Sequence, residues 1–239
     1  MDDLLALAID AHGGMTRWDH LSRFRAAVSI TGTIWDRIER PGLLTDVVLE
    51  GETHVQRLRI TPFPSAGHYA SWEPTRQTLE TAEGAVLAER SGPAFPIATP
   101  DRLDLWDDFQ VVSFASEASW NNLVSPFLLA RPGFVAREIE PWPESREVWR
   151  RLSVSFPEDV AAPSRQQTYY FDGDGYLRRL DYVLDVLGGA PAVEFPSDYR
   201  DFDGITVPTR RIVHERHPDG SPALGPPWVV ADVTRVTFR

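Results

Sequence analysis

The sequence predicts a mainly β protein of the α+β class, a curved antiparallel half-open barrel of about 11 strands with a helical cover and a short N-terminal helix. Apolar residues alternate with polar ones over most of the chain, turn-forming residues separate these stretches, and one long segment has helical periodicity instead. With 42% apolar and 25% charged residues among 239, the composition is that of an ordinary folded protein. We therefore expect residues 1–239 to form a single domain.

The N-terminal segment predicts a helix followed by a strand. Residues 3–11 place their apolar side chains largely on one helical stripe, and Gly13 and Gly14 supply a stop. From Ser22 onward the period changes to two and continues as far as Ile38, which predicts one long half-buried strand. Gly32 would form a bend or bulge within it.

An antiparallel meander is predicted next, after a turn at Pro41 and Gly42. Its short alternating segments are Leu43–Leu49, His54–Ile60, His68–Trp72, Gln77–Thr81 and Ala85–Leu87. Further strands are expected in the second half, at Phe134–Ile139, Trp149–Phe156, Arg165–Phe171, Tyr176–Leu187, Val193–Asp201, Ile205–His217 and Trp228–Phe238. The Asp-Gly pairs within residues 171–176 predict a tight hairpin. Proline-rich residues 140–144 and 221–227 are expected to be surface loops.

Residues 101–130 form the one large apolar segment with helical spacing. Thr99 and Pro100 suit its start, and Pro126 is expected to break it in two. Because strands flank it on both sides, it is a candidate cover for the sheet. Its aromatic residues Trp106, Trp120 and Phe127 could line the apolar end of a cavity, although aromatic residues at this spacing more often belong to the core.

Composition excludes several classes of function. The net charge of −11 disfavours nucleic acid as a partner, and all 24 basic residues are arginines, which excludes lysine chemistry. Cysteine is absent, so thiolate chemistry and disulfides are excluded. No apolar run approaches the ~20 residues of a membrane span, so we expect no integral membrane association. The acidic N-terminus does not resemble a signal peptide, and we expect a cytoplasmic protein.

No motif in the sequence predicts a metal, a cofactor or a catalytic centre. Residues 172–175 resemble the opening of a calcium loop but lack its later ligands. His214 and His217 lack a helical zinc motif. Asp101, Asp104 and Asp108 would share a helix face, and acidic residues at the start of a helix explain them better than a metal site does. We therefore expect no metal and no cofactor, and we assign no catalytic residue.

Three arginines share the inward parity of neighbouring predicted strands. Residues two apart along a strand point to the same face. Arg150 therefore shares a face with Leu152 and Val154, Arg178 with Leu180 and Tyr182, and Arg211 with Val207 and Val213. Together they could bind the anionic head group of a ligand, with Tyr182 beside them. Alternatively, each lies near a strand end and extends to water, or pairs with an acid.

The order of these elements resembles the LolA/LolB-like superfamily of lipoprotein-sorting proteins. The resemblance is carried by His12-Gly13-Gly14, by residues 171–182 and by residues 199–208. It implies a strongly curved, incomplete barrel whose concave face is covered by helices and encloses a cavity for acyl chains. The chain would be a cytoplasmic relative, since it lacks a signal peptide and a lipidation cysteine.

The leading hypothesis is a binding protein for an apolar or lipid-like small molecule, held between the sheet and the helices. The second is an enzyme acting on a hydrophobic metabolite in the same cavity, such as a cyclase, isomerase or hydrolase. It would need a histidine such as His68 or His214 beside a carboxylate. The third is an interaction module, which would show a large exposed apolar patch.

Overall fold

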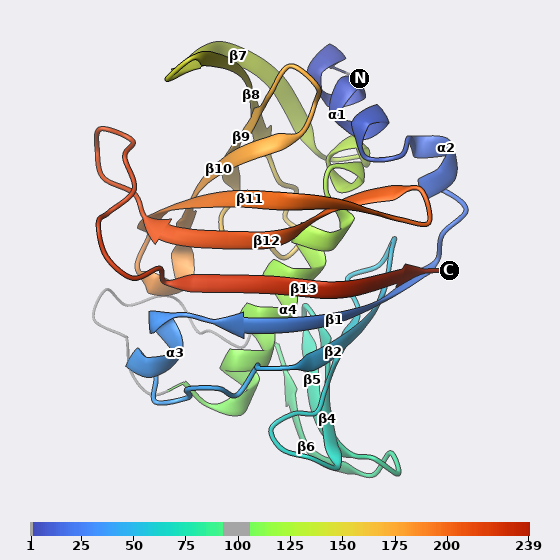
Figure 1. Ribbon diagram of the computed structural model, residues 1–239. Coiled ribbons are helices and arrows are strands. Elements are labelled where there is room, and N and C mark those ends of the chain that lie inside the picture. The colour runs from blue at the N-terminus through green and yellow to red at the C-terminus, as the bar shows by residue number, and fades with distance from the viewer. Residues whose placement is uncertain (1, 93–105) are drawn as a thin grey trace.

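A single antiparallel sheet dominates the computed structural model, which describes residues 2–92 and 106–239. The sheet has 13 strands in the order β6-β5-β4-β3-β2-β1-β13-β12-β11-β10-β9-β8-β7. The curved antiparallel architecture is confirmed, whereas the expected number of about 11 strands is too low. The C-terminal strand β13 lies between β1 and β12 and so joins the two halves of the sequence (Figure 1).

The first half of the sheet is a meander, as predicted. Its strands are β1 (Arg23–Thr31), β2 (Val47–Glu52), β3 (Leu58–Thr61), β4 (His68–Glu73), β5 (Arg76–Thr81) and β6 (Val86–Ser91). The prediction that one strand continues to Ile38 is wrong, because Gly32, at φ 122°, directs the chain into helix α3 (Thr33–Arg37). Ile34 and Ile38 are buried in both cases, since a spacing of four fits a helix and a strand equally well.

The second half contains the longer strands. They are β7 (Val135–Glu144), β8 (Glu147–Ser155), β9 (Gln166–Phe171), β10 (Leu177–Leu184), β11 (Ala190–Phe202), β12 (Ile205–Glu215) and β13 (Val229–Phe238). The hairpin after Phe171 is confirmed, and the Asp172 carboxylate accepts hydrogen bonds from the backbone of Asp174 and Tyr176, both at 3.0 Å. The strand expected to reach Leu187 ends at Leu184, where a 3-10 turn, η2 (Asp185–Leu187), begins.

The expected loop at residues 140–144 is instead the end of strand β7. A bulge follows Ile139, after which Trp142 pairs with Trp149 of β8. Proline is tolerated here because β7 is an edge strand, so a missing N–H costs no ladder hydrogen bond on its open side.

Two short helices precede the first strand, and the first of them packs against β8. Helix α1 (Asp3–Ala11) is confirmed, and the Asp2 side chain caps it by accepting from the Leu4 N–H at 2.9 Å. The short helix α2 (Met15–Trp18) follows. Gly13 is required between them, because it has a φ of 118° and a Cβ there would lie 2.1 Å from the Gly204 carbonyl oxygen.

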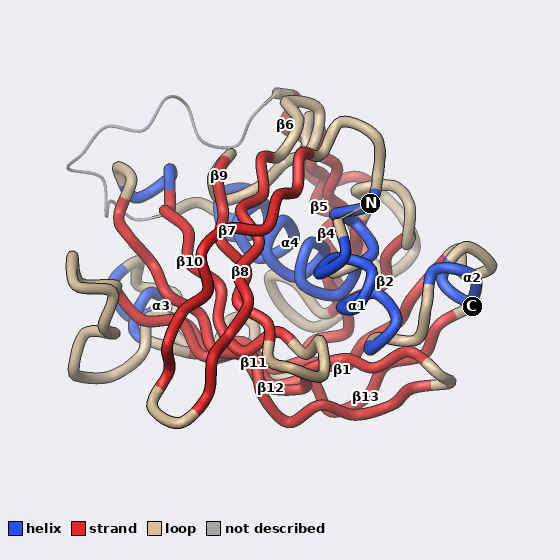
Figure 2. The backbone as a smooth tube through the Cα atoms, turned by 90° about the horizontal axis from the view of Figure 1, so that it is seen from above, coloured by secondary structure: helices blue, strands red, loops and turns tan. Residues whose placement is uncertain are grey.

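Helix α4 (Asp108–Val124) is the cover that the sequence predicts. It starts with a capping box formed by Asp107 and Gln110, and the predicted break at Pro126 separates it from a 3-10 helix, η1 (Phe127–Ala130). The predicted start at Thr99, and with it Asp101 and Asp104, falls outside the described residues. Figure 2 shows the sheet curving around α4.

The hydrophobic core fills the space between the concave face of the sheet and the helices, and it includes buried residues of α1, α4 and both halves of the sheet. Within the described ranges, none of the helices has the length and apolar character needed to cross a membrane.

Candidate ligand-binding site

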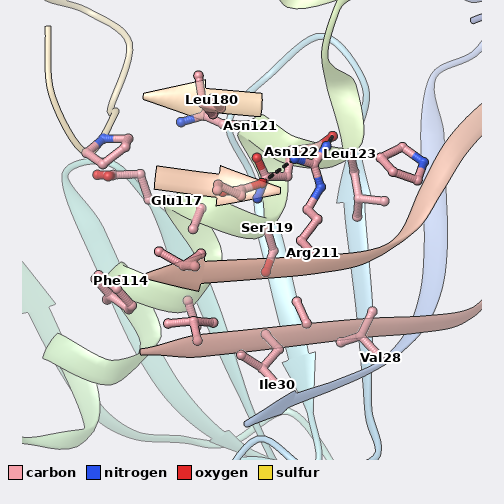
Figure 3. Close-up of a pocket in the computed structure, with 18 of the residues that line it drawn as sticks. Val28, Ile30, Phe114, Glu117, Ser119, Asn121, Asn122, Leu123, Leu180 and Arg211 are labelled. Atoms are coloured by element: carbon pink, nitrogen blue, oxygen red, sulfur yellow. Dashed lines mark hydrogen bonds and ion pairs between the residues drawn. The ribbon is translucent and has the colours of Figure 1, made fainter. Parts of the chain in front are cut away.

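A cavity of about 100 Å³ lies between α4 and the concave face of the sheet. Its walls are largely apolar and come from α4 on one side and from β1, β10, β12 and β13 on the other (Figure 3). The apolar lining includes Val28, Ile30, Phe114, Ala115, Leu123, Leu180, Leu184, Val207, Val213, Val229, Ala231 and Val233. Strand alternation explains this wall, because residues two apart along each strand point to the same face.

The β13 side of the cavity is incompletely covered. Val229, Ala231 and Val233 all face it, yet each keeps partial exposure to solvent. Apolar side chains on the inner face of a sheet are normally covered by the core, so this wall has room for additional apolar material.

A buried ion pair lies in the cavity wall. Arg211 of β12 pairs with Glu194 of β11, and their side chains are only 9% and 4% exposed. A second N–H group of Arg211 donates to the Asn122 carbonyl oxygen of α4 at 3.2 Å. Tyr182 places its hydroxyl 3.5 Å from Glu194, and burial raises the pKa of this phenol well above its usual value. The charge of Arg211 is therefore already neutralised by the protein.

Glu117 of α4 also lines the cavity, and it has a different environment. No hydrogen bond or ion pair engages its carboxylate among the described residues. Burial raises the pKa of Glu117 to about 7, while Arg165 opposes this shift and Asp185 adds to it. Glu117 is thus a partly buried carboxylate that forms no ion pair with a cation in the described part of the chain.

Trp35 of α3 also lines the cavity. Its ring is 3% exposed and contacts Phe114 edge-on, with the ring centroids 6.1 Å apart. The indole Nε1–H is buried, and no described residue supplies a hydrogen-bond acceptor for it. A buried donor without an acceptor is unfavourable, so a ligand oxygen there would be stabilised.

The structure brings Arg211 and Tyr182 to the cavity, but Arg150 and Arg178 lie elsewhere. Arg150 is held by Glu138 through two hydrogen bonds of 2.7 Å. Arg178 is 42% exposed and pairs with Asp172 at 2.6 Å, because a bulge between Leu177 and Arg179 shifts the parity of β10. The three arginines expected to gather around one head group therefore do not meet.

The three aromatic candidates of the covering segment lie in the core rather than in the cavity wall. Trp106 contacts Phe114 at a centroid distance of 5.1 Å. Trp120 donates its Nε1–H to the Glu52 carbonyl oxygen at 2.7 Å, and Phe127 stacks on Trp18 at 4.3 Å. These contacts fix α4 and η1 against the sheet.

No histidine lines the cavity within the described ranges, so His68 and His214 do not form the acid–base pair that the enzyme hypothesis needs. His12 is buried elsewhere, between Tyr176 and Tyr199, and burial lowers its pKa to about 4. One of its ring nitrogens lies 2.7 Å from the Ala8 carbonyl oxygen, which places His12 in the join between α1 and the sheet.

Several polar residues of the cavity were missed in the sequence, among them Glu194, Glu117 and Trp35. Glu194 shares its parity with Ala192 on β11, and this acid on an apolar face was the available signal. Glu117 and Trp35 gave no comparable signal, because their positions depend on how α3 and α4 pack on the sheet.

Comparisons of sequence found no match: no protein-family model matches, and the search of curated proteins found no significant match. Comparisons of structure found proteins of similar fold. A LolA superfamily protein from Nitrosomonas europaea aligns with a TM-score of 0.52 at 9% identity, over 98% of this chain and 92% of the other. A domain from Vibrio parahaemolyticus, described as an outer membrane lipoprotein-sorting protein, gives 0.56 at 10% identity, with the same coverage of 98% and 92%.

A third similar structure is a DUF1329 family protein from Desulfovibrio piger, with a TM-score of 0.50, 14% identity, and coverage of 98% of this chain and 91% of the other. These likenesses extend over nearly the whole chain, although the identities are too low to transfer a function. The chain therefore has the fold of LolA superfamily proteins, as the sequence resemblance implied.

Proposed function

We propose that this protein binds an apolar or lipid-like small molecule in the cavity between α4 and the sheet. The observation that carries the proposal is the partly exposed apolar wall of β13, which faces an existing cavity inside a curved sheet. The LolA-like fold supports it, because one structural neighbour is described as sorting lipoproteins. Apolar burial would provide the affinity, at roughly 25 cal/mol for each Å² removed from water.

The size of the cavity limits what this conformation accepts. A volume of about 100 Å³ is below the ~300–1,000 Å³ typical of small-molecule sites. It suits a group somewhat smaller than a benzene ring, for which a cavity of about 150 Å³ is sufficient. A longer chain needs more room, and α4 or the side chains on it must move, because the strands of the floor are fixed by their ladder hydrogen bonds.

Filling the cavity tests the proposal. Ala231→Trp places a large ring in the β13 wall, and we expect it to weaken the binding of 1-octanol at least about 10-fold, because the ring occupies the ligand volume. Isothermal titration calorimetry measures the affinity, with thermal unfolding as a check of folding.

The matched control is Val230→Trp, at the next position of the same strand. Val230 is not part of the cavity wall and points to the opposite face of the sheet, so this variant should bind octanol like the unmodified protein. Equal octanol affinity in the two variants would overturn the proposal.

A further inference from the structure

The polar end of the cavity carries information about the ligand's head group. Phe114 and Glu117 lie one turn apart on α4 and both face the cavity, and Trp35 contacts Phe114 from α3. Figure 3 shows Phe114 and Glu117 toward one side of the cavity and Arg211 toward the other. This end therefore combines one carboxylate with two aromatic rings.

The charges of the cavity do not cancel. Arg211 and Glu194 neutralise each other, whereas Glu117 has no ion-pair partner among residues 2–92 and 106–239. The nearby Arg165 donates two hydrogen bonds to the carbonyl oxygens of Pro157 and Val160, at 2.7 and 2.6 Å, and so is held by other acceptors. Arg165 contributes one positive charge to the surroundings of Glu117 and Asp185 a second negative one, so the group of Glu117, Asp185 and Arg165 is net negative. An anionic head group would be repelled here, and a cationic one attracted.

The aromatic rings favour the same sign of charge. Ammonium groups bind well over the faces of tryptophan and phenylalanine, and more strongly where water is excluded. Trp35 is almost completely buried, and Phe114 is partly buried beside it. The unpaired Trp35 Nε1–H adds a donor that an oxygen neighbouring the amine could accept from.

We propose that the cavity takes an amphiphile with a protonated amine head, whose ammonium group donates to the Glu117 carboxylate and lies against Trp35 and Phe114. Its apolar chain extends along the valine-rich wall formed by β1, β12 and β13. A hydroxyl group next to the amine would accept from the Trp35 indole. This inference rests on the proposed binding of an apolar ligand, and it reverses the sign of the head group that the arginine pattern suggests.

Three probes with one chain length test the inference: octylamine, 1-octanol and octanoate, each titrated calorimetrically into the unmodified protein. We expect octylamine to bind about 10-fold more tightly than octanol, the ratio typical of a hydrogen bond to a charged group, and octanoate to bind most weakly. The Glu117→Gln variant should bind octylamine only as tightly as it binds octanol, while its affinity for octanol changes less than about twofold.

Glu89→Gln is the control for the loss of one negative charge, because Glu89 is exposed on β6 and outside the cavity wall. It should leave the preference for octylamine unchanged. Octanol or octanoate binding as tightly as octylamine, or a preference for octylamine that survives in Glu117→Gln, would overturn the inference and leave the proposed function in place. Failure of all three probes to bind would instead overturn the proposed function.

Discussion

Arg211→Met is expected to lower the free energy of unfolding by about 3–5 kcal/mol, because it leaves the Glu194 carboxylate buried without a counter-ion. Glu194 is only 4% exposed and lies on the inner face of β11, where water reaches it poorly. The loss of the hydrogen bond from Arg211 to the Asn122 carbonyl should also loosen the contact between β12 and α4. Urea denaturation at neutral pH measures the change.

The double variant Arg211→Met, Glu194→Leu is the control. Since it removes both charges and leaves apolar side chains in their place, most of the lost stability should return. A single variant as stable as the unmodified protein would contradict the account of this pair, and so would a double variant no more stable than the single one.

Glu117→Gln is expected to stabilise the ligand-free protein at about pH 8, by roughly 2–3 kcal/mol, and to have little effect at about pH 4. The pKa of Glu117 is raised from 4.5 to about 7, mainly by burial, so the folded state binds a proton that the unfolded state releases. The ionisation of Glu117 therefore destabilises the folded state. This destabilisation is absent below the pKa of the unfolded state, grows as pH rises towards the pKa of the folded state, and is complete above it. Glutamine removes it because an amide does not ionise.

Glu89→Gln provides a control of opposite sign, measured with the same urea titrations. A hydrogen bond from Arg76 lowers the pKa of Glu89, so its contribution is stabilising above the unfolded pKa and is lost as pH falls. Glu89→Gln should therefore be slightly less stable than the unmodified protein at high pH. A Glu117→Gln variant whose stability relative to the unmodified protein does not change with pH would contradict the environment assigned to Glu117.

The strand pattern predicted the architecture because both halves of the sheet alternate with a clear period of two. The same rule placed Arg211 correctly, since β12 is regular from Ile205 to Val213. It failed for Arg178, where one bulged residue in β10 reverses the parity and no residue in the sequence marks that bulge. It also failed beyond Gly32, because the spacing of Ile34 and Ile38 fits the period of a helix as well as that of a strand.

The composition of the cavity was harder to predict than its existence. Trp106, Trp120 and Phe127 have the helical spacing of a cover, but their apolar faces meet other core residues, which is the commoner outcome for aromatic side chains. Glu117 belongs to the same helix and faces the cavity instead. Which face of α4 meets the core is decided by tertiary contacts such as the one between Trp120 and Glu52.

Mapping bound octanol on the protein by methyl NMR tests the central claim most directly. Titration of octanol into valine-labelled protein should shift the methyl signals of the cavity wall and leave those of exposed valines outside it unchanged. The wall residues are Val28, Val207, Val213, Val229 and Val233, and the exposed ones are Val86, Val135 and Val148. Shifts confined to the exposed valines, or no shifts at saturating octanol, would contradict a ligand site between α4 and the sheet.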